Sequence, residues 1–169
     1  MWRRTNLFLV LLGLAISARA DVKVGDQFPA LAPAGVVNLA GGDLPVTAGR
    51  VVLVDFWASW CAPCKASFPA MAKIHADFSP RGLTIAAISI DEKAPAALAF
   101  WKKQSPPFAT LHDRTQKLVK EVVVPTMPTS YLLDRTGRVR FVHEGFHGDA
   151  TDKQLREEIE KLLAKKATP

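Results

Sequence analysis

The chain has 169 residues, 49% of them hydrophobic, and a formal net charge of +6 at neutral pH. This length suits one compact domain with a sizeable core. No run of basic residues is interleaved with aromatic ones, so nucleic-acid binding is not expected.

Residues 1–20 have the pattern of an export signal peptide. Two arginines, Arg3 and Arg4, precede an apolar run, and the small residues Ala18 and Ala20 flank a cleavage site before Asp21. The apolar run is about half of the ~20 residues that a membrane-spanning helix needs, so an uncleaved anchor is the weaker alternative. We therefore expect a mature domain over residues 21–169 and a periplasmic location.

The first strands are predicted on either side of residue 50. Short strands at 36–39 and 44–46, with a turn at 41–43, predict an N-terminal hairpin that covers a sheet edge. Residues 51–56 are apolar except for Asp55, which indicates a strand buried on both faces. Burial raises the pKa of a carboxyl group, so Asp55 is a candidate for proton transfer.

Both cysteines of the chain, Cys61 and Cys64, follow this strand in a C-x-x-C spacing. Periodic apolar residues predict a helix over 61–78, which places Cys61 at the helix N-terminus, where free N–H groups and the dipole favour the thiolate. Cys61 is the expected nucleophile and Cys64 the resolving thiol. Pro63 fits the first turn of the helix.

Two other roles for the cysteines are weaker. A disulfide that encloses only two residues constrains the unfolded chain little, so a structural role is not favoured. Zinc prefers four ligands, and the chain has one C-x-x-C pair with its histidines scattered. We therefore expect a redox pair and no cofactor or metal.

The elements after the cysteine motif alternate between strand and helix. A helix at 95–104 should turn Leu98 and Trp101 inward, and a helix from Thr151 to Lys165 should begin with a capping box. The complete set of predicted segments comprises strands at 83–90, 108–111, 129–133 and 139–142, helices at 95–104, 113–121 and 151–165, and a hairpin turn at 134–137.

The run V-D-F-W-A-S-W-C-A-P-C-K at 54–65 resembles the active-site segment of the thioredoxin superfamily, in particular its extracytoplasmic TlpA/ResA-like branch. The run T-M-P-T at 126–129 resembles the cis-proline loop of that superfamily. The resemblance implies an α/β thioredoxin-like fold, with a central mixed sheet flanked by helices and an inserted helix at 95–104. Two positions depart from the pattern, Ala87 where cytoplasmic thioredoxins carry a lysine and Ser67 where many relatives carry a glutamate.

The resemblance also implies roles for individual residues. Asp55 corresponds to the buried acid beneath the disulfide, and Pro128 to the cis proline. Met127 would pair through its backbone with a bound polypeptide. The expected substrate-contacting residues are Trp60, Pro63, Met127, Pro128 and Thr129.

These features predict an exported thiol-disulfide oxidoreductase that reduces protein disulfides, for example during cytochrome c maturation. The implied partners are protein disulfides or dithiols and a membrane electron donor, with the protein acting as a monomer. The alternative is a copper-delivery or chaperone module, because copper(I) accepts two thiolates. His143 and His147 are not clearly placed as the distal ligand of such a carrier.

Overall fold

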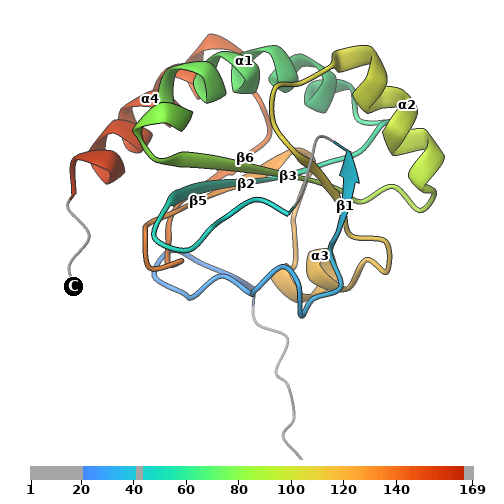
Figure 1. Cartoon of the computed structure of the whole chain (residues 1–169), viewed down its shortest axis with the longest axis horizontal. Coiled ribbons are helices and arrows are strands. Elements are labelled where there is room, and N and C mark those ends of the chain that lie inside the picture. Colours follow the sequence, from blue (N-terminus) through green and yellow to red (C-terminus); the bar gives the residue numbers. More distant parts are fainter. Residues whose placement is uncertain (1–20, 41–43, 166–169) are drawn as a thin grey trace, which may run out of the picture.

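The computed structural model describes residues 21–40 and 44–165, so the expected leader at 1–20 and turn at 41–43 lie outside the described residues. A six-stranded sheet in the order β1-β4-β3-β2-β5-β6 forms the centre of the fold (Figure 1). The strands are β1 (Val37–Ala40), β2 (Val51–Trp57), β3 (Leu83–Ser89), β4 (Thr110–His112), β5 (Thr129–Leu133) and β6 (Val139–Glu144).

The sheet is mixed, as the sequence predicts. The pairs β2–β3 and β3–β4 are parallel, whereas β1–β4, β2–β5 and β5–β6 are antiparallel. All seven residues of β2 are buried, which fits a central strand covered on both faces. This buried strand leads directly to the cysteine motif.

Helices cover both faces of the sheet (Figure 1). The helices are α1 (Ala62–Phe78), α2 (Ala94–Gln104), α3 (Lys117–Val122) and α4 (Asp149–Ala164), with a 3₁₀ turn, η1 (Ser79–Arg81), after α1. Residues from α1, α2 and α4 pack together in one core cluster, and α3 packs with residues 22–36 in the other. None of the helices in residues 21–40 and 44–165 is both long and apolar enough to cross a bilayer.

The predicted N-terminal hairpin is wrong in its second strand. Val37–Ala40 forms β1, but residues 44–47 form no strand, and β1 pairs with β4 instead. The pairing still covers the β4 edge of the sheet, as we expected of the hairpin. Val46 is 71% exposed, so a strand there would bury no apolar side chain in return for ordering its backbone.

Two helices differ from the prediction in their details. In α2 the buried residues are Ala97 and Phe100, whereas Leu98 and Trp101 are only partly buried. Phe100 packs between Trp57 and Phe68, with ring centroids 4.8 and 4.9 Å away, and this aromatic contact sets the rotation of the helix.

Helix α4 begins at Asp149, two residues before the predicted start. Thr151 therefore does not form the expected capping box, and its hydroxyl oxygen instead accepts a hydrogen bond from the His147 N–H at 3.0 Å. Gly148 takes the N-cap position with a positive φ of 63°, a conformation that the sequence pattern did not anticipate.

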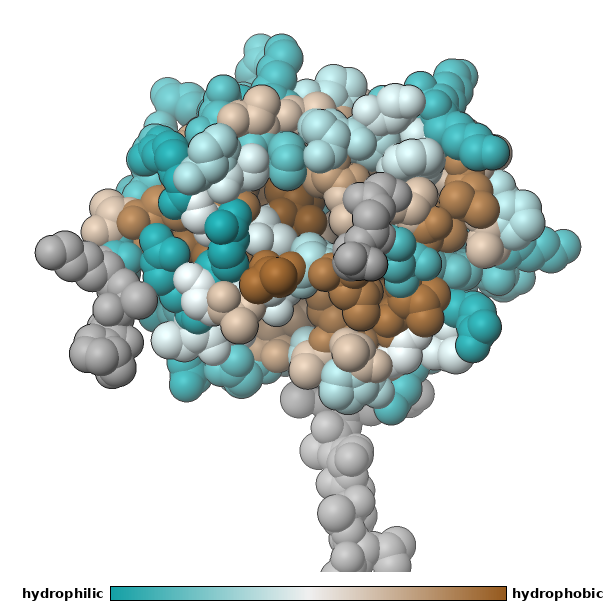
Figure 2. Space-filling model, viewed as in Figure 1, coloured by the Kyte–Doolittle hydropathy of each residue, from teal (hydrophilic) through white to brown (hydrophobic). Residues whose placement is uncertain are grey.

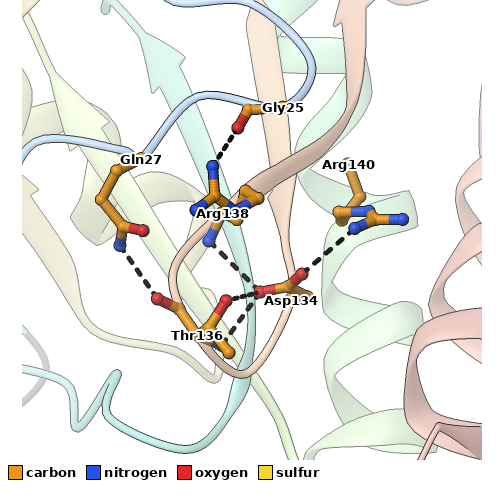
Figure 3. A network of polar contacts seen from close by, with 6 residues as sticks. All are labelled: Gly25, Gln27, Asp134, Thr136, Arg138 and Arg140. Carbon is orange, nitrogen blue, oxygen red and sulfur yellow. Dashed lines mark hydrogen bonds and ion pairs between the residues drawn. The ribbon is translucent and has the colours of Figure 1, made fainter.

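The N-terminal segment is fastened to the β5–β6 turn (Figure 3). Asp134 Oδ1 accepts hydrogen bonds from the Thr136 N–H and hydroxyl, which confirms the predicted turn at 134–137. Gln27 donates to the Thr136 carbonyl at 2.9 Å, and Arg138 donates to the carbonyl of Gly25. These contacts hold residues 25–27 against the end of the sheet.

On the face seen in Figure 2, hydrophobic residues gather across the middle of the molecule, where β1 lies. The exposed apolar side chains include Val37 on β1 and, after that strand, Leu44 and Val46, at 41%, 42% and 71%. Leu44 and Val46 follow the end of β1 and lie outside the sheet.

Candidate active site

The alternation of side chains along β2 places Asp55 beneath α1. Val51, Leu53 and Trp57 pack in the same core cluster as Cys64 and the inner face of α1, whereas the even-numbered residues of β2 pack in the other cluster. Because side chains on a strand alternate between faces, Asp55 points to the α1 side. The acid and the cysteine pair therefore share one face of the sheet.

Cys61 and Cys64 form a disulfide at the N-terminus of α1, with their Cα atoms 5.3 Å apart. Cys61 is the N-cap residue, and its Sγ accepts a hydrogen bond from the Cys64 N–H at 3.2 Å. Cys61 is 5% exposed and Cys64 fully buried. This arrangement agrees with Cys61 as the sulfur that a partner reaches first. Pro63 lies in the first turn of the helix, as predicted.

The surface beside Cys61 is apolar and accessible. The Trp60 side chain is 66% exposed, although most large apolar side chains among residues 21–40 and 44–165 are buried. Ala62 and Pro63 are exposed as well. An exposed aromatic residue next to a reactive group is a common feature of protein-binding sites. Trp60 and Pro63 are thus available to a partner.

The second predicted loop precedes β5. The Met127–Pro128 peptide is cis, as the resemblance implies. Met127 is partly buried, so part of it remains accessible, whereas Pro128 and Thr129 are buried. The Thr129 hydroxyl donates to the Thr126 carbonyl at 2.8 Å, so this side chain shapes the loop instead of facing solvent.

Asp55 is 1% exposed, and burial raises its pKa from 3.8 to about 7, although the hydrogen bond from Ser130 opposes the shift. Ser130 lies opposite Asp55 on β5 and donates to its Oδ1 at 2.6 Å. On the other side, β3 places Ala87 directly beside Asp55, which confirms that the lysine of cytoplasmic thioredoxins has no counterpart at this position. A carboxyl group with a near-neutral pKa can accept and return a proton.

Sequence reasoning missed two polar residues of the site, Ser130 and Asp91. The buried Asp91 carboxylate accepts hydrogen bonds from the Ser59 N–H at 2.9 Å and the Ser59 hydroxyl at 2.6 Å. It therefore holds the loop that presents Trp60 and Cys61. Asp91 could have been found from the sequence, because it is an acidic residue at the end of an apolar strand. The contact of Ser130 with Asp55 is seen only from the register between β2 and β5.

Ser67 and His143 are engaged in local contacts. The Ser67 hydroxyl is buried and donates to the Cys64 carbonyl at 2.9 Å. His143 Nε2 lies 2.6 Å from Glu158 Oε2 in a buried pair. Within residues 21–40 and 44–165, no group of three or more His, Cys, Asp or Glu side chains is placed to hold a metal ion.

The site combines a C-x-x-C disulfide at a helix N-terminus with a buried acid and a cis-proline loop. Similarity to known proteins shows which family has this combination. Residues 23–159 match the Redoxin family model. The chain belongs to the Redoxin family. Within it, the ResA-like resemblance of the motifs is confirmed by the curated relatives and by a solved structure.

One relative is the thiol-disulfide oxidoreductase ResA of Bacillus subtilis (strain 168), 32% identical over 147 residues, which cover 80% of each chain. Another is the ResA protein of Bacillus thuringiensis subsp. konkukian (strain 97-27), also 32% identical; the match covers 68% of this chain and spans 64% of the length of that relative.

A crystal structure of a putative thiol:disulfide interchange protein DsbE from Chlorobium tepidum is 33% identical. Its TM-score is 0.74, and the match covers 85% of this chain and 99% of that one. The thioredoxin-like fold class is therefore confirmed.

Proposed function

We propose that the protein is a thiol-disulfide oxidoreductase that reduces disulfides in other proteins. The observation that carries the proposal is the Cys61–Cys64 disulfide at the start of α1, with the exposed Trp60 beside its outer sulfur. The relatives named thiol-disulfide oxidoreductase support the same activity.

The reaction begins with the reduced pair. The Cys61 thiolate attacks one sulfur of a target disulfide, a mixed disulfide forms, and the first target thiolate leaves. Cys64 then loses its thiol proton to Asp55 and attacks Cys61 Sγ. The Cys61–Cys64 bond forms, the bond to the target breaks, and the second target thiolate leaves. Two electrons have passed from the cysteine pair to the target.

The elements around the pair support this sequence of steps. The N-terminus of α1 favours negative charge on Cys61. Burial favours the neutral form of Asp55, and its pKa of about 7 allows both protonation states near neutral pH. Trp60, Pro63 and Met127 offer an apolar surface to a polypeptide target, and Pro128 and Thr129 fix the loop that carries Met127.

The setting of the reaction is part of the proposal. The leader-like residues 1–20 support export to the periplasm, where a membrane disulfide-transfer protein would return electrons to the pair. Haem-site disulfides of apocytochrome c are one candidate substrate class, and the protein would act as a monomer. These assignments rest on the sequence pattern and the ResA-like resemblance.

The direct test is reduction of insulin disulfides by the mature protein. We expect turnover by the native chain and none above background by Cys61→Ser. Cys64→Ser should instead accumulate a mixed disulfide on Cys61, which mass spectrometry detects and which identifies the partner when the variant is expressed in its host. Equal activity of the native chain and Cys61→Ser would overturn the proposal.

A further inference from the structure

The two oxygens of the Asp55 carboxyl group have different surroundings. Oδ1 accepts a hydrogen bond from the Ser130 hydroxyl, with 2.6 Å between the two oxygens. Oδ2 is buried and has no hydrogen-bond partner among the residues that the structure describes. A buried polar oxygen without a partner is costly, so an acid at this position gains from a proton or a water molecule at Oδ2.

A cavity of about 10 Å³ adjoins this acid, which is room for about one water molecule. Its polar lining comes from Asp55, Ser67, Ser130 and Thr151. The hydroxyls of Ser67 and Ser130 each donate elsewhere and keep an oxygen lone pair, and the Thr151 hydroxyl keeps its proton because it accepts from His147. The set therefore supplies the two to four partners that a buried water needs.

The position of the cavity also indicates the direction in which a proton would leave Asp55. It extends from the sheet to Gly145 and Phe146, which belong to the loop between β6 and α4. Both residues are only partly buried. The Asp55 carboxyl is thus separated from solvent on this side by the width of one small cavity and one loop.

Other titratable groups lie on the elements packed over this face. They are Cys64 and His75 on α1, His143 on β6 and Glu158 on α4. His143 and Glu158 bond to each other, and the His75 ring contacts Phe108. On the same face, β3 places Ala87 and β5 places Ser130 beside the acid. Ser130 is the residue whose side chain is hydrogen-bonded to this carboxyl group.

From these contacts we propose that Ser130 is a positioning residue. It binds Asp55 Oδ1, so that the proton released by Cys64 is held on Oδ2 and passes to a water molecule in the cavity below the β6–α4 loop.

This inference rests on the proposed reaction. Cys64 S–H gives its proton to Asp55 Oδ2, the Cys64 thiolate displaces the target sulfur from Cys61, and Asp55 Oδ2–H passes its proton to the water, which returns one to solvent. The carboxylate is then restored, and no other reactant is needed. Because the Ser130 proton occupies Oδ1, the two oxygens do not exchange roles.

The test has two measurements. Carbon-13 NMR follows the titration of the Asp55 carboxyl group, and a kinetic assay measures, as a function of pH, the rate at which the target is released from the mixed disulfide. In Ser130→Ala we expect Asp55 to titrate at higher pH, because the bond from Ser130 lowers the pKa of this carboxyl group. The release profile should move by the same amount. At a pH below both midpoints, a tenfold weaker acid at position 55 should release the target about tenfold more slowly, since its ionised fraction is tenfold smaller.

Ser130→Thr, which keeps a hydroxyl, should titrate close to the native protein. The matched control is Thr110→Val, which removes a buried hydroxyl that has no hydrogen-bond partner among the described residues. It should change neither readout. An unchanged Asp55 midpoint in Ser130→Ala would overturn the positioning role of Ser130.

A shifted midpoint with an unchanged release profile would have another meaning. It would confirm that Ser130 positions the acid, but it would remove Asp55 from the proton transfer and so overturn that step of the proposed reaction.

The water site is tested with Ala70, which also lines the cavity. Water-to-protein NMR cross-peaks are expected at the methyl groups of Ala70 and Thr151, and Ala70→Val should abolish the peak at Thr151 and slow release severalfold. Absence of these cross-peaks in the native protein would overturn the water route.

Discussion

His143 on β6 and Glu158 on α4 form a buried pair, with Nε2 2.6 Å from Oε2 and side chains only 7% and 8% exposed. Gln154, one turn before Glu158, donates to its other carboxylate oxygen at 3.2 Å. The pair joins the edge strand of the sheet to the last helix. Removing one member of a buried pair leaves the other without compensation.

We therefore expect Glu158→Ala to lower the free energy of unfolding by about 1–3 kcal/mol, because the buried His143 nitrogen loses its hydrogen-bond partner. Glu157→Ala is the matched control, because Glu157 is less buried on the same helix and should change stability little. Replacing both partners by leucine should recover most of the loss, since an apolar pair leaves no buried polar group unsatisfied. Urea unfolding of the four proteins measures the differences, and equal losses in the single and double variants would contradict this account.

Asp55 should make stability depend on pH. Its folded pKa of about 7 lies above its ordinary value of 3.8, so the folded protein binds the proton more tightly than the unfolded chain does. The resulting stabilisation is present in full below about pH 4 and is lost as the pH rises to about 7. The loss is about 1.36 kcal/mol for each pH unit from pH 5 to about pH 7 and then levels off, so it amounts to about 3 kcal/mol between pH 5 and pH 8.

Asp55→Asn removes this dependence, because an amide does not titrate. The difference in unfolding free energy between the oxidised native protein and the variant should therefore change by about 3 kcal/mol from pH 5 to pH 8, in favour of the variant. Parallel stability profiles for the two proteins would show that Asp55 does not retain its proton on folding.

The inserted helix α2 should depend on one aromatic residue. Phe100 is 7% exposed and packs against Trp57 and Phe68, so Phe100→Ala should cost about 3–5 kcal/mol of stability. Leu98→Ala on the same helix should cost less, because Leu98 is only partly buried. Comparison of the two variants by thermal or urea unfolding tests which face of α2 holds it to the domain.

The cysteine pair should be reducing. Ala62 and Pro63 between the sulfurs carry no charge, and Lys65 is exposed, so little positive charge stabilises a thiolate at Cys61 beyond the helix N-terminus. We expect a reduction potential nearer to the about −270 mV of thioredoxin than to the about −120 mV of a strong oxidant such as DsbA. Equilibration with glutathione buffers measures it, and a value near about −120 mV would indicate a disulfide-forming role.

Much of the fold could be predicted because the spacing of hydrophobic residues and the identity of turn residues determine structure between residues that are close in the sequence. β5 forms over the predicted 129–133, and the turn that follows is fixed by Asp134 and Gly137, which lie close together in the sequence. The prediction of a second hairpin strand was wrong because strand pairing here depends on residues far apart in the sequence. Whether β1 pairs with a neighbour in sequence or with β4 is decided by a contact such as that between Val37 and His112, which no local pattern contains.

The site divides in the same way. Cys61, Cys64, Asp55 and the cis-proline loop lie in short recognisable runs, so the sequence identifies them. Ser130 could not be assigned in advance, because its role depends on the register between β2 and β5. The rotation of α2 likewise depends on the ring of Phe68 in another helix.

The two edges of the sheet have a consequence for solubility. A long, flat edge strand with free backbone groups invites pairing between molecules. β1 has four residues and a register shift at Asn38, and β6 carries the charged Arg140 and Glu144 and is shifted where it meets Leu133. Each edge of the described sheet therefore has a short regular stretch interrupted by a register shift, which disfavours extension of the sheet by a second copy of the chain.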